Sequence, residues 1–317
     1  GILMAYVTIG FASLATQGSS SGIVTFVVMM FVLFGMSVSD GEKMECFWQE
    51  MVLFSGGCFL TYLLRTCRVF SEELELEGIT DLLTFSGLSM VMLLVSVAML
   101  CLVHGTRRKN RYFAKVWTIL FKVAAIAAPA AIVVVLLLIL ANTLLGGTIF
   151  KNVTDPEMAK WLTFRADWGS NRGATWAAGA RCFWEADFLH KIFGVGPDCM
   201  YSFLANEGSE GLQNMVNDRF LGNRLTNAHN EWLTILVNMG VLGLVSFAGM
   251  MISAIRNFLR AGKTSMLVGA CGFCVLAYTV NNMFSFQQVM NISTVFVILG
   301  IGGNVWRSVQ VEIPRTS

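Results

Sequence analysis

The side chains best suited to chemistry lie in one polar part of the sequence. His229, Asn230 and Glu231 directly precede a long apolar segment, where burial costs free energy unless these groups meet water or a partner. An imidazole with its ordinary pKa of about 6.5 can accept a proton at neutral pH. Arg172 lies upstream, and a guanidinium binds phosphate oxygens through a fork of N–H donors. This part of the chain therefore offers a base and an anion-binding group. The alternative is that His229 lies at the membrane interface with its hydrogen bonds satisfied and has no catalytic role.

Local patterns place Arg172 on a helix. The sequence from Arg172 predicts a helix because Arg172, Trp176 and Gly179 recur at three- and four-residue spacing. Residues 194–198 (Gly-Val-Gly-Pro-Asp) then end it, since glycines followed by proline stop a helix and turn the chain.

The elements that must position these groups are predicted to cross a membrane. Of 317 residues, 55 % are hydrophobic and only 13 % charged, against about 25 % charged in soluble domains. Spanning helices need about 20 mostly apolar residues, and only internal hydrogen bonding satisfies their backbone in lipid. The candidate spans are 1–15, 22–39, 49–66, 82–103, 122–146, 231–254, 265–284 and 289–305. We predict an all-α fold, a polytopic transmembrane bundle with about eight spans and one long helical extracytoplasmic loop.

The same composition excludes other classes of protein. Scarce charge argues against a soluble enzyme, and abundant apolar residues argue against disorder. The net charge of +2 gives no support for a nucleic-acid partner. Eight cysteines are too sparse for a disulfide scaffold, and Cys182 and Cys199 could be either paired or free. No Cys/His cluster has zinc-like spacing, so we expect neither metal nor cofactor. The chain starts inside an apolar segment, and we expect it to be a fragment that lacks N-terminal spans.

Basic residues predict the orientation of the spans. The loops 104–115 and 256–263 each carry at least three Lys or Arg and no acid, which places both in the cytoplasm. One crossing, 122–146, separates the first loop from residues 147–230, which are therefore expected outside. The predicted parts are 1–146 (N-terminal helices, truncated), 147–230 (extracytoplasmic loop) and 231–317 (C-terminal helices and cytoplasmic tail).

The long external stretch is rich in aromatic residues. Trp161, Trp168, Trp176 and Trp184 lie within it, and Trp232 lies at its exit. Tryptophan collects at membrane interfaces, so a helical cap on the bundle is one interpretation. Stacking of sugar rings on these side chains is the other. A loop of this length is usually functional or disordered, and its composition does not favour disorder.

At these subsegments the chain resembles the O-antigen ligase/O-antigen polymerase superfamily of bacterial membrane glycosyltransferases. The motifs are Arg172, Trp176, the turn 193–196, Ala-His-Asn-Glu-Trp-Leu at 228–233 and Gly-Val-Leu-Gly at 240–243. The serine-rich segment 16–22 resembles the family's earlier external turn. Many members have Arg after Ser there, whereas this chain has Ser, so no role of that arginine is carried over.

The resemblance implies transfer or polymerisation of glycans in surface polysaccharide synthesis (O-antigen, capsule or exopolysaccharide), at the outer face of the bacterial cytoplasmic membrane. The implied partners are a polyprenyl-diphosphate-linked oligosaccharide donor, a glycan or lipid acceptor, and the bilayer. His229 and Arg172 are then the catalytic candidates, one taking the acceptor's proton and the other holding the diphosphate, with inversion at the anomeric carbon. Asn230 or Glu231 is expected to orient the imidazole. No Asp-x-Asp motif occurs in the loop, so the reaction is expected to be metal-independent. The expected substrate-binding residues are Arg165, Arg181, Arg224, Trp176, Asn230 and Glu231, with Arg219 a further helper.

Alternatives stay open at this point. Arg181 and Glu185 are four residues apart and can simply pair on a wet helix face. A lipid or glycan transporter (flippase) is the second functional hypothesis, although charges inside spans mark transport paths and these spans are nearly charge-free. A structural or sensory membrane protein is the third, and it needs no pairing of histidine with arginine.

Overall fold

The structure is a computed structural model, and the part of the chain that it describes is helical. It describes residues 1–17, 20–38, 40–67, 69, 78–85, 87–106, 111–154, 159, 161–220 and 224–312. Helices account for most of these residues, and no strand occurs among them. The predicted all-α class is therefore confirmed.

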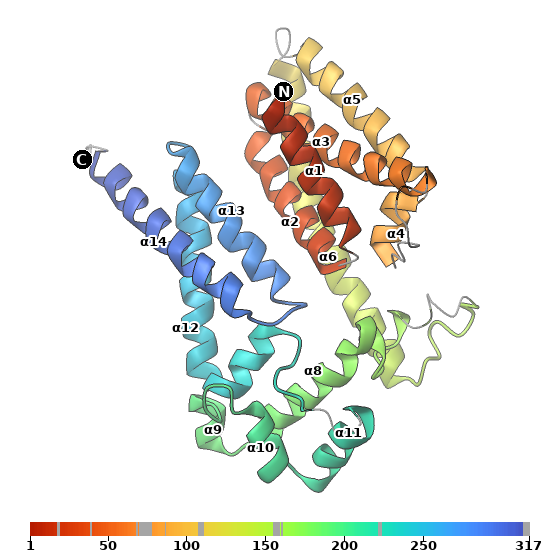
Figure 1. Cartoon of the computed structure of the whole chain (residues 1–317), viewed down its shortest axis with the longest axis vertical. Helices are drawn as coiled ribbons and strands as arrows, with labels where there is room; N and C mark the ends of the chain where they lie inside the picture. The colour runs from red at the N-terminus through yellow and green to blue at the C-terminus, as the bar shows by residue number, and fades with distance from the viewer. Residues whose placement is uncertain are drawn as a thin grey trace. The chain divides into compact units, whose positions relative to one another are not determined.

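Figure 1 shows the helices in chain order. Those of the first half are α1 (Ile2–Thr16), α2 (Ser20–Ser37), α3 (Gly41–Thr66), α4 (Gly78–Phe85), α5 (Leu88–Thr106) and α6 (Arg111–Leu144). Those of the second half are α8 (Trp168–Glu185), α9 (Phe188–Phe193), α10 (Met200–Asn206), α11 (Glu210–Phe220), α12 (Glu231–Ala261), α13 (Met266–Asn281) and α14 (Val289–Glu312).

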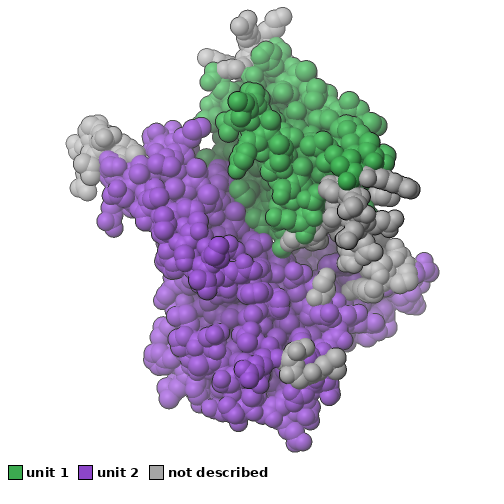
Figure 2. Space-filling view, in the orientation of Figure 1, with its two compact units in different colours: residues 1–130 green, residues 131–317 purple. Residues whose placement is uncertain are grey.

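The chain forms two compact units, drawn in different colours in Figure 2. Unit 1 comprises Gly1–Ala130 and unit 2 comprises Ala131–Ser317, so the boundary falls inside α6. The stretch 147–230 belongs to the same unit as α12, α13 and α14. The three-part division drawn from the sequence stays a prediction.

Unit 1 is held together by apolar contacts among its helices. Phe26 of α2 stacks on Phe54 of α3 with ring centroids 4.1 Å apart, and Phe11 of α1 meets both rings edge-on. Gly57 lets α1 and α3 approach closely, because a Cβ there would lie 2.8 Å from the Thr8 carbonyl oxygen.

Unit 2 builds a small core from the helices of the 147–230 stretch. Cys182 of α8, Met200 of α10 and Leu212 of α11 are completely buried there, and Val237 of α12 joins the same cluster. The predicted helical loop is thus a packed layer of α8 to α11 against the first turns of α12. Its placement outside the membrane stays a prediction.

Within the part of the chain that the structure describes, four helices are long and apolar enough to cross a membrane. They cover Leu88–Gly105, Lys122–Leu144, Glu231–Ala261 and Val289–Ser308. Three shorter apolar helices cover Ile2–Thr16, Ser21–Ser37 and Met266–Asn281. The prediction of multiple spans is confirmed, whereas the number of about eight stays a prediction.

Several predicted boundaries were wrong. The segment 82–103 is divided between α4 and α5, because α4 ends at Phe85 and α5 begins at Leu88. The basic segment 256–263 is mostly helix, since α12 continues to Ala261. In the basic segment 104–115, α5 ends at Thr106 and α6 begins at Arg111, and the residues between lie outside the described ones. Charged residues can continue a helix beyond its apolar part, because their long side chains reach water there. Charge alone therefore did not mark the helix ends.

Candidate functional site

Arg172 lies in an irregular first turn of α8. Gly169 and Asn171 have positive φ angles of 59° and 69°, and Gly173 packs so tightly that a Cβ would overlap the Arg165 carbonyl oxygen. The sequence Gly-Ser-Asn-Arg-Gly suits such a turn, since Gly and Asn tolerate left-handed backbone. The guanidinium is fixed from within this turn, because Arg172 Nη1 donates to the Gly169 carbonyl at 3.0 Å.

His229 lies directly before α12 and also has left-handed backbone, with φ 48°. Its backbone N–H donates to Asn227 Oδ1 at 3.0 Å. The imidazole meets the ring of Phe286 edge-on, with ring centroids 5.1 Å apart. Among the described residues, neither ring nitrogen has a hydrogen-bond partner, and the side chain keeps access to solvent. The histidine is therefore held by its backbone and ring face, and its nitrogens are left for a ligand.

The connection between α13 and α14 (residues 282–288) brings these two side chains together. Arg172 Nε donates to the Phe284 carbonyl at 3.0 Å, across more than one hundred residues of sequence. Two residues further on, Phe286 meets His229. Partial burial lowers the pKa of His229 below its usual 6.5, and the nearby Arg172 guanidinium lowers it further. The imidazole is therefore neutral at pH 7 and can accept a proton.

Glu231 fixes this connection to the start of α12. Its backbone N–H donates to the carbonyls of Asn282 (2.9 Å) and Ser285 (3.0 Å), and its Oε2 accepts from the Gln287 backbone N–H at 2.7 Å. Only 4 % of the residue is exposed. Asn230 caps α12 by accepting the Leu233 N–H at 3.1 Å. The sequence suggested that Asn230 or Glu231 orients the imidazole; their hydrogen bonds go to the helix cap and to the connection, and the orienting role stays a prediction.

The glycine turn after α9 fits into a break in α12. Gly240 has φ 66° and ψ −170° and interrupts the helical hydrogen bonds. The freed carbonyls of Val237 and Asn238 accept from the backbone N–H groups of Val195 and Gly196, both at 3.0 Å. A Cβ at Gly240 would overlap the Ile192 carbonyl oxygen. The predicted turn at 194–198 thus fits into a break in α12, whereas the sequence predicted an unbroken span over 231–254.

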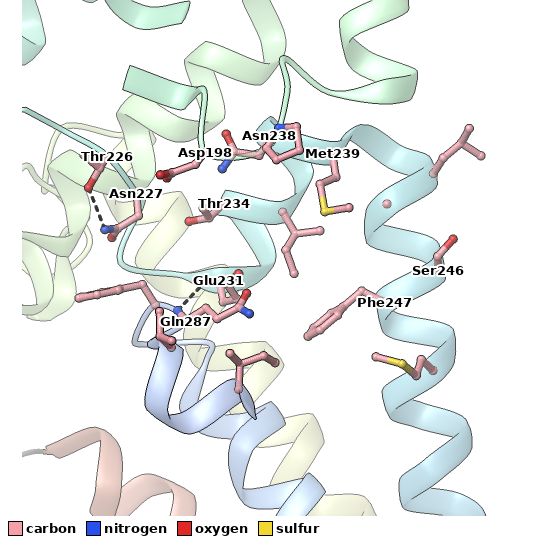
Figure 3. Close-up of a pocket in the computed structure, with 18 of the residues that line it drawn as sticks. Asp198, Thr226, Asn227, Glu231, Thr234, Asn238, Met239, Ser246, Phe247 and Gln287 are labelled. Carbon is pink, nitrogen blue, oxygen red and sulfur yellow. Dashed lines mark hydrogen bonds between the residues drawn. The ribbon is translucent and has the colours of Figure 1, made fainter. Parts of the chain in front are cut away.

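This break borders a cavity of about 860 Å³ within unit 2, shown in Figure 3. Polar side chains line one part, among them Asp198, Thr226, Asn227, Glu231, Asn238 and Gln287. Apolar side chains from the later part of α12 and from α14 line the rest, among them Leu242, Phe247, Met250, Ile292 and Phe296. Phe286, the residue against His229, also lines it. His229 itself does not line this amphipathic cavity, but it contacts Phe286 of the cavity wall.

Comparison with known proteins assigns the chain to a family. Residues 78–248, more than half of the chain, match the family model described as O-Antigen ligase. The chain belongs to the O-antigen ligase family. A comparison with curated proteins found no match. Membership confirms the resemblance read from the motifs and implies a membrane ligase of the glycosyltransferase type.

The matched residues of this O-antigen ligase family member include Arg172 and His229 but end before the connection 282–288. The sequence did not point to that connection as part of the site. The sequence does contain a signal for it, namely two pairs of polar residues between two apolar segments, Asn281–Asn282 and Gln287–Gln288. Polar side chains at the ends of spans are expected to face water or a site, and this rule would have selected the connection.

Other predicted substrate-binding arginines have local partners. Arg181 Nη2 donates to Glu185 Oε1 at 2.9 Å, which is the surface pair suggested by their spacing. Arg224 lies over the ring of Tyr201, 5.4 Å from its centroid. These contacts are compatible with ligand binding but do not require it.

Two further arginines lie near α8. Arg219 donates to Asn171 Oδ1, beside Arg172. Arg165 is exposed, and its backbone carbonyl accepts the Trp168 N–H. Their part in binding stays a prediction.

Trp176 belongs to an aromatic cluster on α8. Its ring lies 5.6 Å from that of Trp168, which in turn meets Phe164 and Trp161. The Trp176 indole N–H is buried and donates to no described residue. This packing agrees with the interpretation of the aromatic residues as a helical cap, and direct sugar stacking by Trp176 stays a prediction.

Cys182 and Cys199 are not bonded to each other. Both thiols are free, and Cys182 is completely buried. Burial raises the pKa of Cys182 to about 12, with a smaller contribution from Glu185. A thiol that stays protonated is a poor partner for disulfide exchange.

Proposed function

We propose that this family member is a multi-pass glycosyltransferase of the bacterial cytoplasmic membrane, with its 147–230 layer on the outer face. It would transfer or polymerise glycan units from a polyprenyl diphosphate carrier onto an acceptor sugar hydroxyl during surface polysaccharide synthesis. Family membership and four candidate membrane spans support this assignment. The observation that carries it is the convergence of Arg172 and His229 on one short connection.

In the proposed reaction His229 acts as general base. The acceptor hydroxyl oxygen forms a bond to the anomeric carbon while its proton passes to the imidazole. The bond from that carbon to the diphosphate oxygen breaks, and the electron pair leaves with the diphosphate. Direct displacement inverts the anomeric centre, and the imidazolium later returns its proton to water. The lowered pKa of His229 supports this role because the free enzyme then holds a neutral base at pH 7.

Arg172 would bind the departing diphosphate. Two of its five N–H donors bond to carbonyl oxygens, and the other three have no partner among the described residues. These donors can meet phosphate oxygens, and a guanidinium stays charged even though burial lowers its pKa. We propose that this charge replaces a divalent ion, in keeping with the absence of an Asp-x-Asp motif from residues 147–230.

The test replaces Arg172 and His229 separately by Ala in the full-length protein, expressed in a strain that lacks the native copy. Loss of a general base costs about 10²- to 10⁴-fold in rate, and loss of a group that stabilises developing charge costs about 10²- to 10³-fold. Both variants should therefore abolish surface polymer while the protein still reaches the membrane. His190→Ala and Arg260→Ala are matched controls, because His190 pairs with Asp187 and Arg260 lies in the last turn of α12.

The accumulating intermediate would separate the two activities within the family. Single lipid-linked repeat units indicate a polymerase, and long lipid-linked chains indicate a ligase. Wild-type polymer in both Ala variants would refute the proposed site.

A further inference from the structure

The cavity beside His229 contains two buried side chains with unused polar atoms. Glu231 is 4 % exposed, and its carboxylate forms a hydrogen bond only through Oε2. Asn238 is 8 % exposed, and its Oδ1 accepts the Met200 N–H at 3.0 Å. Glu231 Oε1 and Asn238 Nδ2 bond to no residue that the structure describes, although both side chains line the cavity. Neither atom is fully shielded from solvent, so a ligand that enters the cavity can form hydrogen bonds with both.

The positions of these two atoms favour a ligand with several hydroxyl groups. Glu231 and Asn238 are seven residues apart in the regular part of α12, before its break, and therefore lie on one face about 10 Å apart. One offers a carboxylate acceptor and the other an amide donor, and a hydroxyl can satisfy either. A saccharide presents hydroxyl groups repeatedly over such a distance.

The charge of the cavity favours an uncharged ligand. Asp198 and Glu231 line it, whereas no Lys or Arg occurs among its lining residues. A diphosphate would be repelled there, since like charges in a partly enclosed site are unfavourable. Arg172, the group suited to diphosphate, is not part of the lining. Arg172, which suits an anion, is thus separate from Glu231 and Asn238, which suit hydroxyl groups. His229 is close to both sites, because Arg172 lowers its pKa and its ring contacts Phe286 of the cavity wall.

We propose that this cavity is the acceptor site, and that it holds an uncharged saccharide whose reacting hydroxyl is presented to His229. The inference rests on the proposed function, because it assigns the second substrate of the same reaction. Glu231 and Asn238 bind sugar hydroxyls at the polar end of the cavity. Leu242 and Ile292 contribute apolar walls beside this polar end. The donor diphosphate approaches from the side of Arg172.

The test compares two neighbouring glutamines in the full-length protein, purified in lipid nanodiscs. Gln287 lines the cavity and Gln288 does not, although both are exposed. Their known hydrogen bonds use backbone atoms, which a substitution keeps. Gln287→Trp should narrow the polar end, whereas Gln288→Trp adds the same bulk outside it. A third variant, Glu231→Gln, is nearly isosteric and keeps an oxygen for the Gln287 N–H.

Two probes separate the acceptor from the donor. One is the free oligosaccharide released by mild acid from the lipid-linked glycan of the source organism, and the other is undecaprenyl diphosphate. Gln287→Trp and Glu231→Gln should each weaken oligosaccharide binding about tenfold or more, the equivalent of one or two lost hydrogen bonds. Both should leave undecaprenyl diphosphate binding within about twofold of wild type. Gln288→Trp should change neither affinity.

Three results would overturn the assignment. These are equal effects of the two Trp substitutions, loss of diphosphate binding with saccharide binding intact, and a wild-type protein that binds no oligosaccharide. The Arg172→Ala variant tests the proposed function separately, since it should lose undecaprenyl diphosphate and keep the oligosaccharide. If it keeps both, the donor role of Arg172 is wrong while the acceptor cavity stands.

Discussion

The break in α12 makes a sharp prediction about Gly240. Its φ of 66° and ψ of −170° fall in a region that essentially only glycine occupies. A methyl group there would overlap the Ile192 carbonyl oxygen. Gly240→Ala must therefore either keep the strained backbone or straighten the helix. A straightened α12 would recover the carbonyls of Val237 and Asn238 for itself and release the glycine turn at Val195.

The magnitude follows from these contacts. Keeping a glycine-only backbone conformation costs about 1 to 3 kcal/mol. Losing the two hydrogen bonds to Val195 and Gly196 costs about 1 kcal/mol each. These are alternative outcomes, so we expect Gly240→Ala to destabilise unit 2 by about 1 to 3 kcal/mol by either route. For a unit of this size, that lowers the midpoint of thermal unfolding by roughly 5 °C.

The assay is thermal unfolding of the purified protein in detergent, followed by intrinsic tryptophan fluorescence. Gly249→Ala is the matched control, because it lies in the same helix and a Cβ there meets no atom within 4 Å. Alanine is the better helix former by about 1 kcal/mol, so the control should be neutral or slightly more stable. Gly240→Ala with wild-type stability and wild-type transfer would refute the idea that the break positions the turn and the cavity.

Two further predictions concern catalysis and the loop layer. The wild-type transfer rate should rise with pH along an acid limb whose midpoint lies below 6.5, because the neutral form of His229 is the base and its pKa is lowered. Arg172→Gln removes the guanidinium that disfavours the protonated imidazole, so the pKa of His229 should rise. The acid limb of the residual transfer rate should then move to higher pH. An unmoved limb would contradict the electrostatic effect of Arg172 on His229. Asn142 is buried, its amide donates to Leu162 and Thr163, and its oxygen accepts from two further backbone N–H groups. Asn142→Ala should cost about 2 to 4 kcal/mol and speed limited proteolysis of residues 147–163, and unchanged cleavage would show that other contacts hold this segment.

The part of the site that the sequence predicted depends on local signals. His229 was identifiable because polar residues directly precede a long apolar segment, and Arg172 because it begins a helical pattern in a motif typical of the family. The helix stop at Gly194 was also correct in place, because glycine ends a helix through its own backbone. The sequence predicted one helix from Arg172 to the stop at Gly194 and missed its division into α8 and α9, because Asp187 caps the second helix through contacts with His190 that periodicity does not reveal.

Roles that depend on distant partners could not be predicted. Glu231 was expected to act on its neighbour, but its carboxylate bonds to Gln287, which lies 56 residues later in the chain. Arg181 and Arg172 had the same chemistry in the sequence. Only the packing of the helices gives them different roles. Arg181 pairs with Glu185 at the surface, whereas Arg172 reaches the Phe284 carbonyl in a half-buried site.

The sequence by itself determined the helical class, the presence of several apolar helices long enough to cross a membrane, the family and the two side chains placed at the centre of the proposed reaction. These follow from composition, periodicity and short motifs, which are properties of residues close together in the chain. Tertiary structure alone decided that the connection 282–288 joins Arg172 to His229, that Gly240 receives the glycine turn, and that a cavity opens beside them. Each of these depends on hydrogen bonds or contacts between residues far apart in sequence. Their formation is settled by how the helices pack, which no local pattern encodes.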